Sequence, residues 1–262
     1  MDETLVTKKK GHYLYAIVSN GDSLELEVSG IAGEAVRFLS FGGIAAAVSP
    51  YPLKKIRPER KNLMAHNNVL KALLEVTTVL PMTFGTIIDN TEQIYKILDL
   101  NKDALGKQLS EIEGCVEMGL QVNWDVPNIF EYFIDIHPEL KRARDQLMPP
   151  SQEPSRHAKI ELGQLFDQTV NRDRRQHAET IEGVLQSVCS DIKRLEPPRD
   201  LKEVVRFALL VKRDKVDELE NELVKAANLF DNSYSFDYNG PWALFNFASI
   251  NLEIEATSDL ST

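Results

Sequence analysis

The side chains that most often carry out acid–base, nucleophilic or metal chemistry are few in this chain and far apart. There are five histidines and two cysteines in 262 residues. A histidine can act as a general base or bind a metal, and a cysteine thiolate can act as a nucleophile. Such chemistry is signalled by fixed spacings such as H-E-x-x-H, C-x-x-C or G-x-S-x-G, and none of these motifs is present. The residues therefore predict no catalytic, metal-binding or cofactor-binding site.

The histidine and cysteine positions favour structural roles. His66 lies at helical spacing from Leu63 and Leu70, so we interpret it as a partly buried, hydrogen-bonded histidine in preference to a ligand or general base. Cys115 and Cys189 are interpreted as small apolar residues in a reduced, cytosolic protein. An enzyme with a dispersed site stays as an alternative, because catalytic residues can come from distant segments.

Two clusters of basic residues stand out because the chain has a formal net charge of −10. They are KKIRPERK, residues 54–61, and RDRR, residues 172–175. The usual interpretation of each is a solvated face. For the second cluster, the alternative is a contact with an acidic protein partner through Arg172, Arg174 and Arg175. The acidic balance argues against nucleic acid and against an anionic membrane surface as partners.

The segment GPWALFNF, residues 240–247, places three aromatic residues directly after a Gly-Pro pair. Because proline cannot continue a hydrogen-bonded ladder, Gly240-Pro241 is expected to end a strand. We predict that Trp242 then folds back into the core at a turn. Leu244 and Phe245 are predicted to be partly exposed and to contact a partner protein. The alternative is that the whole segment is core.

The elements that position these residues alternate between strands and amphipathic helices. Apolar runs and alternating patterns predict strands at 12–18, twice within 35–50 around Gly42-Gly43, at 77–88 interrupted by Pro81, and at 115–124, 204–213, 233–238 and 248–254. Apolar residues at three-to-four spacing predict helices that open at Pro58, begin near Asp89, cover 129–147 with a break at His137-Pro138, and cover 214–230.

Residues 155–196 are predicted to form one long helix or two consecutive helices. The middle of this segment, residues 171–177, contains no apolar residue. We therefore predict that part of the helix projects from the sheet as an arm, with a break in the helix as the alternative.

The predicted fold class is α+β, with amphipathic helices packed on two sheets. A boundary just before the strand at Val116 divides the chain into an N-terminal domain, residues 1–112, and a C-terminal domain, residues 113–262, which contains the long helical segment 155–196. The first residues, MDETLVTKKK, lack the apolar stretch of a secretion signal, and the apolar runs are too short to cross a membrane. These features predict a cytoplasmic protein.

Three stretches, in chain order, resemble the motifs of a known family. YLYAIV, residues 13–18, resembles its first strand. VLPMTFGT, residues 79–86, is similar to the pattern V-L-P-x-R-F-G-T, and the matching residues include Pro81, Phe84 and Gly85. GPWALFNF is similar to G-P-W-P-P-Y-S-F, and the matching residues are Gly240, Pro241, Trp242 and Phe247. On these motifs the chain resembles the gas vesicle proteins F and L, without distinguishing F from L.

The resemblance implies a cytoplasmic accessory protein of the gas vesicle, either a minor component or an assembly factor, with no enzyme activity and no cofactor. Its implied partners are the very hydrophobic major shell protein, which it would keep from aggregating before nucleation, and other gas vesicle accessory proteins. The resemblance also implies two α+β domains of ferredoxin-like character. The element order expected for the second half, βαβαββ, differs from βαββαβ, so a modified ferredoxin-like sheet is predicted.

The alternative function is a small-molecule-binding regulatory module, because ferredoxin-like sheets often hold ligands. A pocket with converging polar groups would favour this module or an enzyme. An exposed apolar groove or sheet edge would favour the assembly factor.

Overall fold

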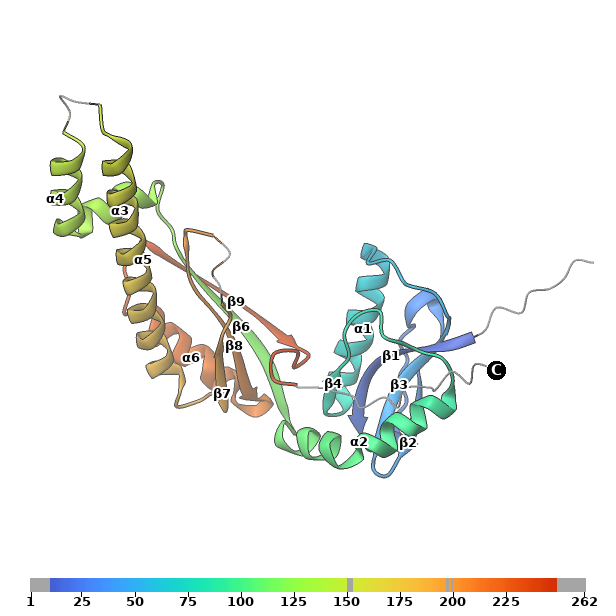
Figure 1. Ribbon diagram of the computed structural model, residues 1–262. Helices are drawn as coiled ribbons and strands as arrows, with labels where there is room; N and C mark the ends of the chain where they lie inside the picture. The colour runs from blue at the N-terminus through green and yellow to red at the C-terminus, as the bar shows by residue number, and fades with distance from the viewer. Residues whose placement is uncertain (1–9, 150–152, 197, 199, 249–262) are drawn as a thin grey trace, which may run out of the picture. The chain divides into compact units, whose positions relative to one another are not determined.

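The computed structural model describes residues 10–149, 153–196, 198 and 200–248 (Figure 1). These residues form six α-helices and two β-sheets, which confirms the α+β class. The described residues divide into two compact units: the first holds residues 10–117 and 242–248, and the second lies within Met118–Pro241. The division lies close to the predicted boundary at 112/113. Residues 242–248, which the sequence analysis assigned to the C-terminal domain 113–262, pack with the first unit.

The first unit is built on a sheet with strand order β2-β3-β1-β4, in which β5 also pairs with β1. Its strands are β1 Lys10–Ser19, β2 Arg37–Phe41, β3 Ile44–Pro52, β4 Val79–Pro81 and β5 Ile87–Ile88. Strand β1 is central, and its residues 13–18 are all buried, as its continuous apolar run predicted. The predicted hairpin joins β2 and β3 at Gly42-Gly43, whose positive φ angles of 59° and 88° suit glycine.

Two helices cover opposite faces of this sheet. Helix α1 Arg60–Val76 follows Glu59, so it begins two residues after the predicted start at Pro58. Helix α2 Thr91–Glu111 is capped by the Asn90 side chain, which accepts a hydrogen bond from the Gln93 N–H. Tyr13 of β1 bonds to His66 of α1, whereas the adjacent His12 bonds to Thr91 of α2. Because neighbouring strand residues point to opposite faces, each helix covers one face.

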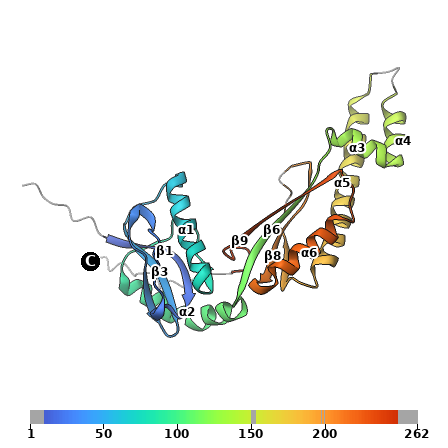
Figure 2. The same cartoon turned by 180° about the vertical axis from the view of Figure 1, so that it is seen from behind.

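The second unit contains a four-stranded sheet with order β7-β8-β6-β9. Its strands are β6 Cys115–Trp124, β7 Asp191–Arg194, β8 Glu203–Lys212 and β9 Tyr234–Trp242, and its helices are α3 Ile129–Ile136, α4 Pro138–Leu147, α5 Arg156–Leu185 and α6 Val216–Ala227. Counting α3–α5 as one helical connection, the element order is βαββαβ. Both views show α5 and α6 side by side along this sheet (Figures 1 and 2).

The long helix is shorter than predicted. Part of the segment that was predicted to be helical forms a strand instead, and this strand accounts for the irregular element order expected of the second half. Helix α5 starts at Arg156, one residue after the predicted start at 155, with Ser155 as its cap, and it ends at Leu185. Residues 191–194 form β7, antiparallel to β8, with Ile192 opposite Leu209. Apolar spacing alone could not separate this short edge strand from the helix before it. With β7 in place, the observed βαββαβ order is compatible with the ferredoxin-like arrangement. The predicted strand 248–254 lies outside the described residues beyond Ala248.

The predicted arm at residues 171–177 is wrong. Asp173 is buried, and Val170 and Ala178 on either side of the stretch are buried as well. The stretch lacks apolar side chains because its anchors to the rest of the unit are polar. His137 Nε2 and Asp173 Oδ2 lie 2.8 Å apart, and Arg174 reaches carbonyl oxygens at the start of β8. The helix break predicted at His137-Pro138 is confirmed, since α3 ends at Ile136 and α4 begins at Pro138.

Candidate partner-binding site

The C-terminal segment Trp242–Ala248 packs on the first unit and presents two aromatic rings to solvent. Ala243 and Leu244 are 6% and 0% exposed, whereas Trp242 and Phe245 are 42% and 47% exposed. The segment borders a hollow of about 190 Å³, which α1 lines with Asn67, Leu70 and Lys71. The two exposed rings and this hollow form what we call the aromatic surface.

A buried carboxylate holds the segment in place. Glu117, at 6% exposure, accepts a hydrogen bond from the Asn246 backbone N–H at 2.9 Å and a second from the Asn246 side-chain amide. Hydrogen bonds to both oxygens offset the cost of burying a carboxylate, and they fix the groups that donate to it. In the alternating sequence of 115–124, Glu117 lies on the polar face, opposite Val116 and Met118, and such a face usually points to solvent. Glu117 is buried because the C-terminal segment covers it, which a local pattern cannot show.

A tight turn sets which side chains of the segment face inward. Phe245 N–H donates to the Ala243 carbonyl at 2.7 Å, and the Leu244 carbonyl accepts from Phe247 N–H at 3.2 Å and from Ala248 N–H at 2.9 Å. The turn directs Leu244 inward and leaves Phe245 outside. Lys71 Nζ lies 5.3 Å from the centre of the Trp242 ring, within the range of a cation–π contact.

These positions correct two predictions about GPWALFNF. Trp242 was predicted to be core and is 42% exposed, whereas Leu244 was predicted to be partly exposed and is completely buried. Phe245 is exposed, as predicted. Strand β9 also continues through Gly240-Pro241 to Trp242, because β9 is an edge strand, where a proline does not interrupt the ladder.

The second motif, VLPMTFGT, closes over a buried pair of polar rings. Pro81 is paired with Ala16 in the sheet. The Phe84 ring centre lies 5.7 Å from that of His66. Gly85, with φ of 93°, donates its N–H to Tyr13 Oη at 2.9 Å. The motif therefore has a structural role in this unit: it covers and orients a core hydrogen bond.

The buried pair itself is Tyr13 and His66, with 3.0 Å between Tyr13 Oη and His66 Nδ1. Tyr13 Oη also accepts a hydrogen bond from the Gly85 N–H, so it bonds to both the motif and the histidine. Burial lowers the pKa of His66 to about 4 and raises the pKa of Tyr13 to about 12. Both groups are therefore neutral at neutral pH, and His66 is the buried, hydrogen-bonded histidine that its helical spacing predicted.

The basic cluster RDRR does not form one exposed patch. The Arg174 guanidinium donates to the carbonyl oxygens of Asp200, Leu201 and Glu203 at 2.8–3.0 Å, and it lies 5.6 Å from the Trp124 ring centre. Burial lowers the pKa of Arg174 below its usual range, and the nearby Glu203 opposes the shift. Arg172 pairs with Glu139 and Asp173, and Arg175 is exposed. Arg174 is thus a structural residue of the second unit, which leaves Arg172 and Arg175 accessible to a partner.

We expect Arg174→Lys to lower the free energy of unfolding of the second unit by about 1–2 kcal/mol. A lysine ammonium cannot reproduce the planar fork that donates to several carbonyls, so one or more of them loses its partner. Urea denaturation measures the change, and Arg175→Lys, one residue away and exposed, is the matched control. Equal stabilities of the two variants would contradict the structural role of Arg174.

The described residues contain no group of three or more His, Cys, Asp or Glu side chains placed to hold a metal ion. In the same part of the chain, no helix is both long and apolar enough to cross a membrane. Burial raises the pKa of the Cys189 thiol to about 12, so it is protonated at neutral pH and is a poor nucleophile.

Comparison with known proteins supports the motif resemblance over almost the whole chain. The family model described as "Gas vesicle synthesis protein GvpL/GvpF" matches residues 11–249. Gas vesicle protein F of Streptomyces sp. (strain CB03234) is 27% identical over 238 residues, which cover 90% of this chain and 98% of the relative. Gas vesicle protein L of the same strain is 25% identical over an alignment of 267 positions, which covers 91% of this chain and 92% of the relative.

Two solved structures share the fold. The crystal structure of GvpF from Anabaena sp. PCC7120 has a TM-score of 0.81 at 23% identity and covers 92% of this chain and 99% of that one. GvpF from Microcystis aeruginosa has a TM-score of 0.77 at 24% identity, with the same coverage. Because the family model spans more than half of the chain, the chain belongs to the GvpL/GvpF family of gas vesicle synthesis proteins.

Proposed function

We propose that this chain is a cytoplasmic accessory protein of gas vesicle formation that binds the hydrophobic major shell protein through Trp242 and Phe245. Family membership supports the accessory role. The observation that supports the binding surface is the exposure of both rings, 42% and 47%, on a segment held by a buried carboxylate. Other gas vesicle accessory proteins are further proposed partners.

The aromatic surface has the properties of an interface anchor. Aromatic side chains bury large areas with little loss of conformational entropy, and they dominate the binding energy of many interfaces. Covering the exposed halves of the two rings would remove roughly 200 Å² of apolar surface from water, worth at most about 5 kcal/mol. The segment that carries the rings is already held by the Glu117–Asn246 hydrogen bonds, so little ordering of its backbone is required on binding.

The chemistry of the partner agrees with such a surface. A very hydrophobic shell subunit exposes apolar area that drives aggregation unless another protein covers it. A carrier with a net charge of −10 stays soluble while it does so. The hollow beside Trp242, at about 190 Å³, is smaller than the roughly 300–1,000 Å³ of typical small-molecule pockets, which favours a protein partner at this surface.

We expect Trp242→Ser with Phe245→Ser to reduce recovery of the shell protein about tenfold or more in co-expression and pull-down experiments. The reason is the loss of both anchors from the centre of the contact. Because both side chains are about half exposed, the thermal unfolding temperature should change little.

The matched control is Val224→Ser with Leu229→Ser, which removes two exposed apolar side chains, each 60% exposed, from the second unit. This control should recover as much shell protein as the parent chain. If the Trp242 and Phe245 variant recovers as much shell protein as the parent chain, the proposed surface is wrong. An equal loss in both variants would show that general hydrophobicity, and not this surface, accounts for binding.

A further inference from the structure

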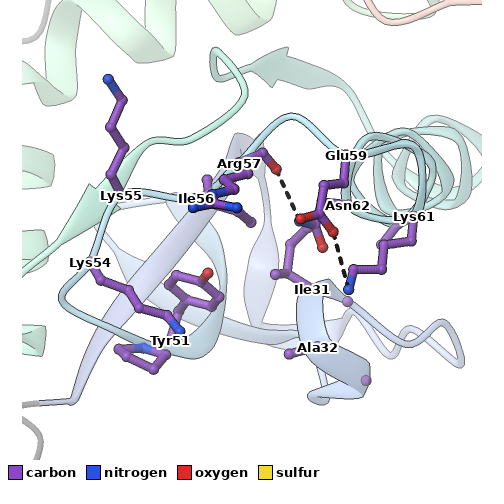
Figure 3. Close-up of a pocket in the computed structure, with 14 residues that line it drawn as sticks. Ile31, Ala32, Tyr51, Lys54, Lys55, Ile56, Arg57, Glu59, Lys61 and Asn62 are labelled. Atoms are coloured by element: carbon purple, nitrogen blue, oxygen red, sulfur yellow. Dashed lines mark hydrogen bonds and ion pairs between the residues drawn. The ribbon is translucent and has the colours of Figure 1, made fainter.

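The first unit contains a second, larger groove on another part of its surface. It has a volume of about 780 Å³ and is bordered by three segments: the turn 30–33, the loop 52–57 that follows β3, and the first turns of α1 (Figure 3). The loop carries much of the first basic cluster, KKIRPERK, for which the proposed function has no use. We call this groove the basic groove.

Positive charge is concentrated along the rim of the basic groove. Four exposed cations line it: Lys54, Lys55, Arg57 and Lys61. Glu59 is the acidic residue among the lining side chains, and it pairs with Lys61 at 3.2 Å. A net positive rim on a chain with a net charge of −10 is a local reversal of sign, which attracts an anionic partner.

The floor of the groove is apolar and rigid. Ile31, Tyr51 and Ile56 line it and are otherwise buried, with exposures of 1%, 9% and 7%. Ile31 N–H donates to Tyr15 Oη at 2.7 Å, which ties the turn to the core. Ala32 on this turn has φ of 58°, a left-handed conformation that is unfavourable for a residue with a Cβ. Such a conformation persists where the surrounding structure holds it in place, so this wall is preformed.

We infer that the basic groove binds an acidic peptide segment of a partner protein, with alternating apolar side chains on the floor and carboxylates at the rim. The cations extend from separate points along a loop and a helix, and Figure 3 shows Lys54 and Lys55 pointing in different directions. A single phosphate would require them to converge. The volume is also within the roughly 300–1,000 Å³ of ligand sites, enough for a short peptide stretch.

The probe is a fluorescein-labelled peptide of eight residues that alternates Glu and Leu, with binding to the full chain followed by fluorescence anisotropy. We expect saturable binding that weakens as salt is raised, because exposed charge pairs are screened. Lys54→Gln, Lys55→Gln and Arg57→Gln together should raise the Kd about tenfold or more, since each lost pair contributes modestly and the three add.

The matched control is Lys141→Gln with Arg156→Gln and Lys159→Gln, which removes three exposed cations from the second unit. This control should keep the parent Kd within about twofold. Two further peptides separate the contribution of the charged rim from that of the apolar floor. A peptide with Gln in place of Glu should bind at least tenfold more weakly, and a peptide with Gly in place of Leu should also bind more weakly.

Equal losses in the groove variant and the control variant would overturn the proposal, because they would show binding to positive charge in general. Displacement of the peptide by inorganic phosphate at matched ionic strength would also overturn it and would identify an anion site instead. Both results are independent of the aromatic surface, so the two proposals can fail separately.

Discussion

Leu244→Asp should detach the C-terminal segment and lower the free energy of unfolding of the first unit by about 4 kcal/mol. The side chain is completely buried. Its replacement removes the apolar contacts of a leucine and places a carboxyl group where it has no prepared partner. Substitutions that combine these two costs are among the most destabilising single changes. Urea denaturation measures the loss, and limited chymotrypsin digestion reports the detachment by cleavage after Phe245 or Phe247.

Phe245→Asp is the matched control, because it introduces the same charge one residue along at a site that is 47% exposed. It should change stability by less than about 1 kcal/mol and should leave digestion slow. The contrast between neighbouring residues tests the turn geometry directly. If both variants behave alike, the segment does not pack on the first unit with Leu244 inward.

Acidification should destabilise the first unit through His66 by about 2 kcal/mol between pH 7.5 and pH 5.0. Burial lowers the pKa of His66 from 6.5 to about 4 in the folded chain. Above pH 6.5, His66 is neutral in both states. As the pH falls from 6.5 towards about 4, the unfolded state binds a proton that the folded state does not, so stability falls over this window. Neutral aromatic rings surround the site, namely Tyr13, Tyr15 and Phe84.

The measurement is urea-dependent hydrogen exchange of the β1 amides, which report on the first unit alone. His66→Gln keeps a polar side chain that can bond to Tyr13 but does not titrate. This variant should have a free energy of unfolding about 1 kcal/mol below that of the parent at pH 7.5. On going to pH 5.0, its free energy of unfolding should fall by about 2 kcal/mol less than the parent's. The carboxylates and His12 contribute equally to the pH dependence of stability in both proteins, so their contributions cancel when the two are compared. An identical pH dependence in the parent and the variant would rule out His66 as the source.

Most of the described strands and several helix boundaries could be predicted from the sequence because their signals are local. The apolar run 12–18 predicted strand β1, and Gly42-Gly43 predicted the turn between β2 and β3. Pro81 predicted the interruption between β4 and β5, and His137-Pro138 the break between α3 and α4. Each depends on side-chain alternation or on the backbone constraints of glycine and proline, which act within a few residues. The family could also be recognised, because its motifs are short and continuous.

The candidate site could be predicted only in part. The sequence located GPWALFNF and the exposure of Phe245. The inward position of Leu244 follows from a turn closed by backbone hydrogen bonds. The burial of Glu117 follows from a bond to Asn246, 129 residues away. No pattern of neighbouring residues contains this contact.

What the sequence determined by itself was therefore the fold class, the main elements and the family, because local periodicity and short motifs carry that information. Only the tertiary structure decided that residues 191–194 pair with β8, and that polar anchors hold residues 171–177 against the second unit. It also decided that the cations of 54–61 border a groove completed by the distant turn at Ile31. In each case the deciding interaction is a hydrogen bond or contact between segments far apart in the chain, and its partner cannot be identified from either segment alone.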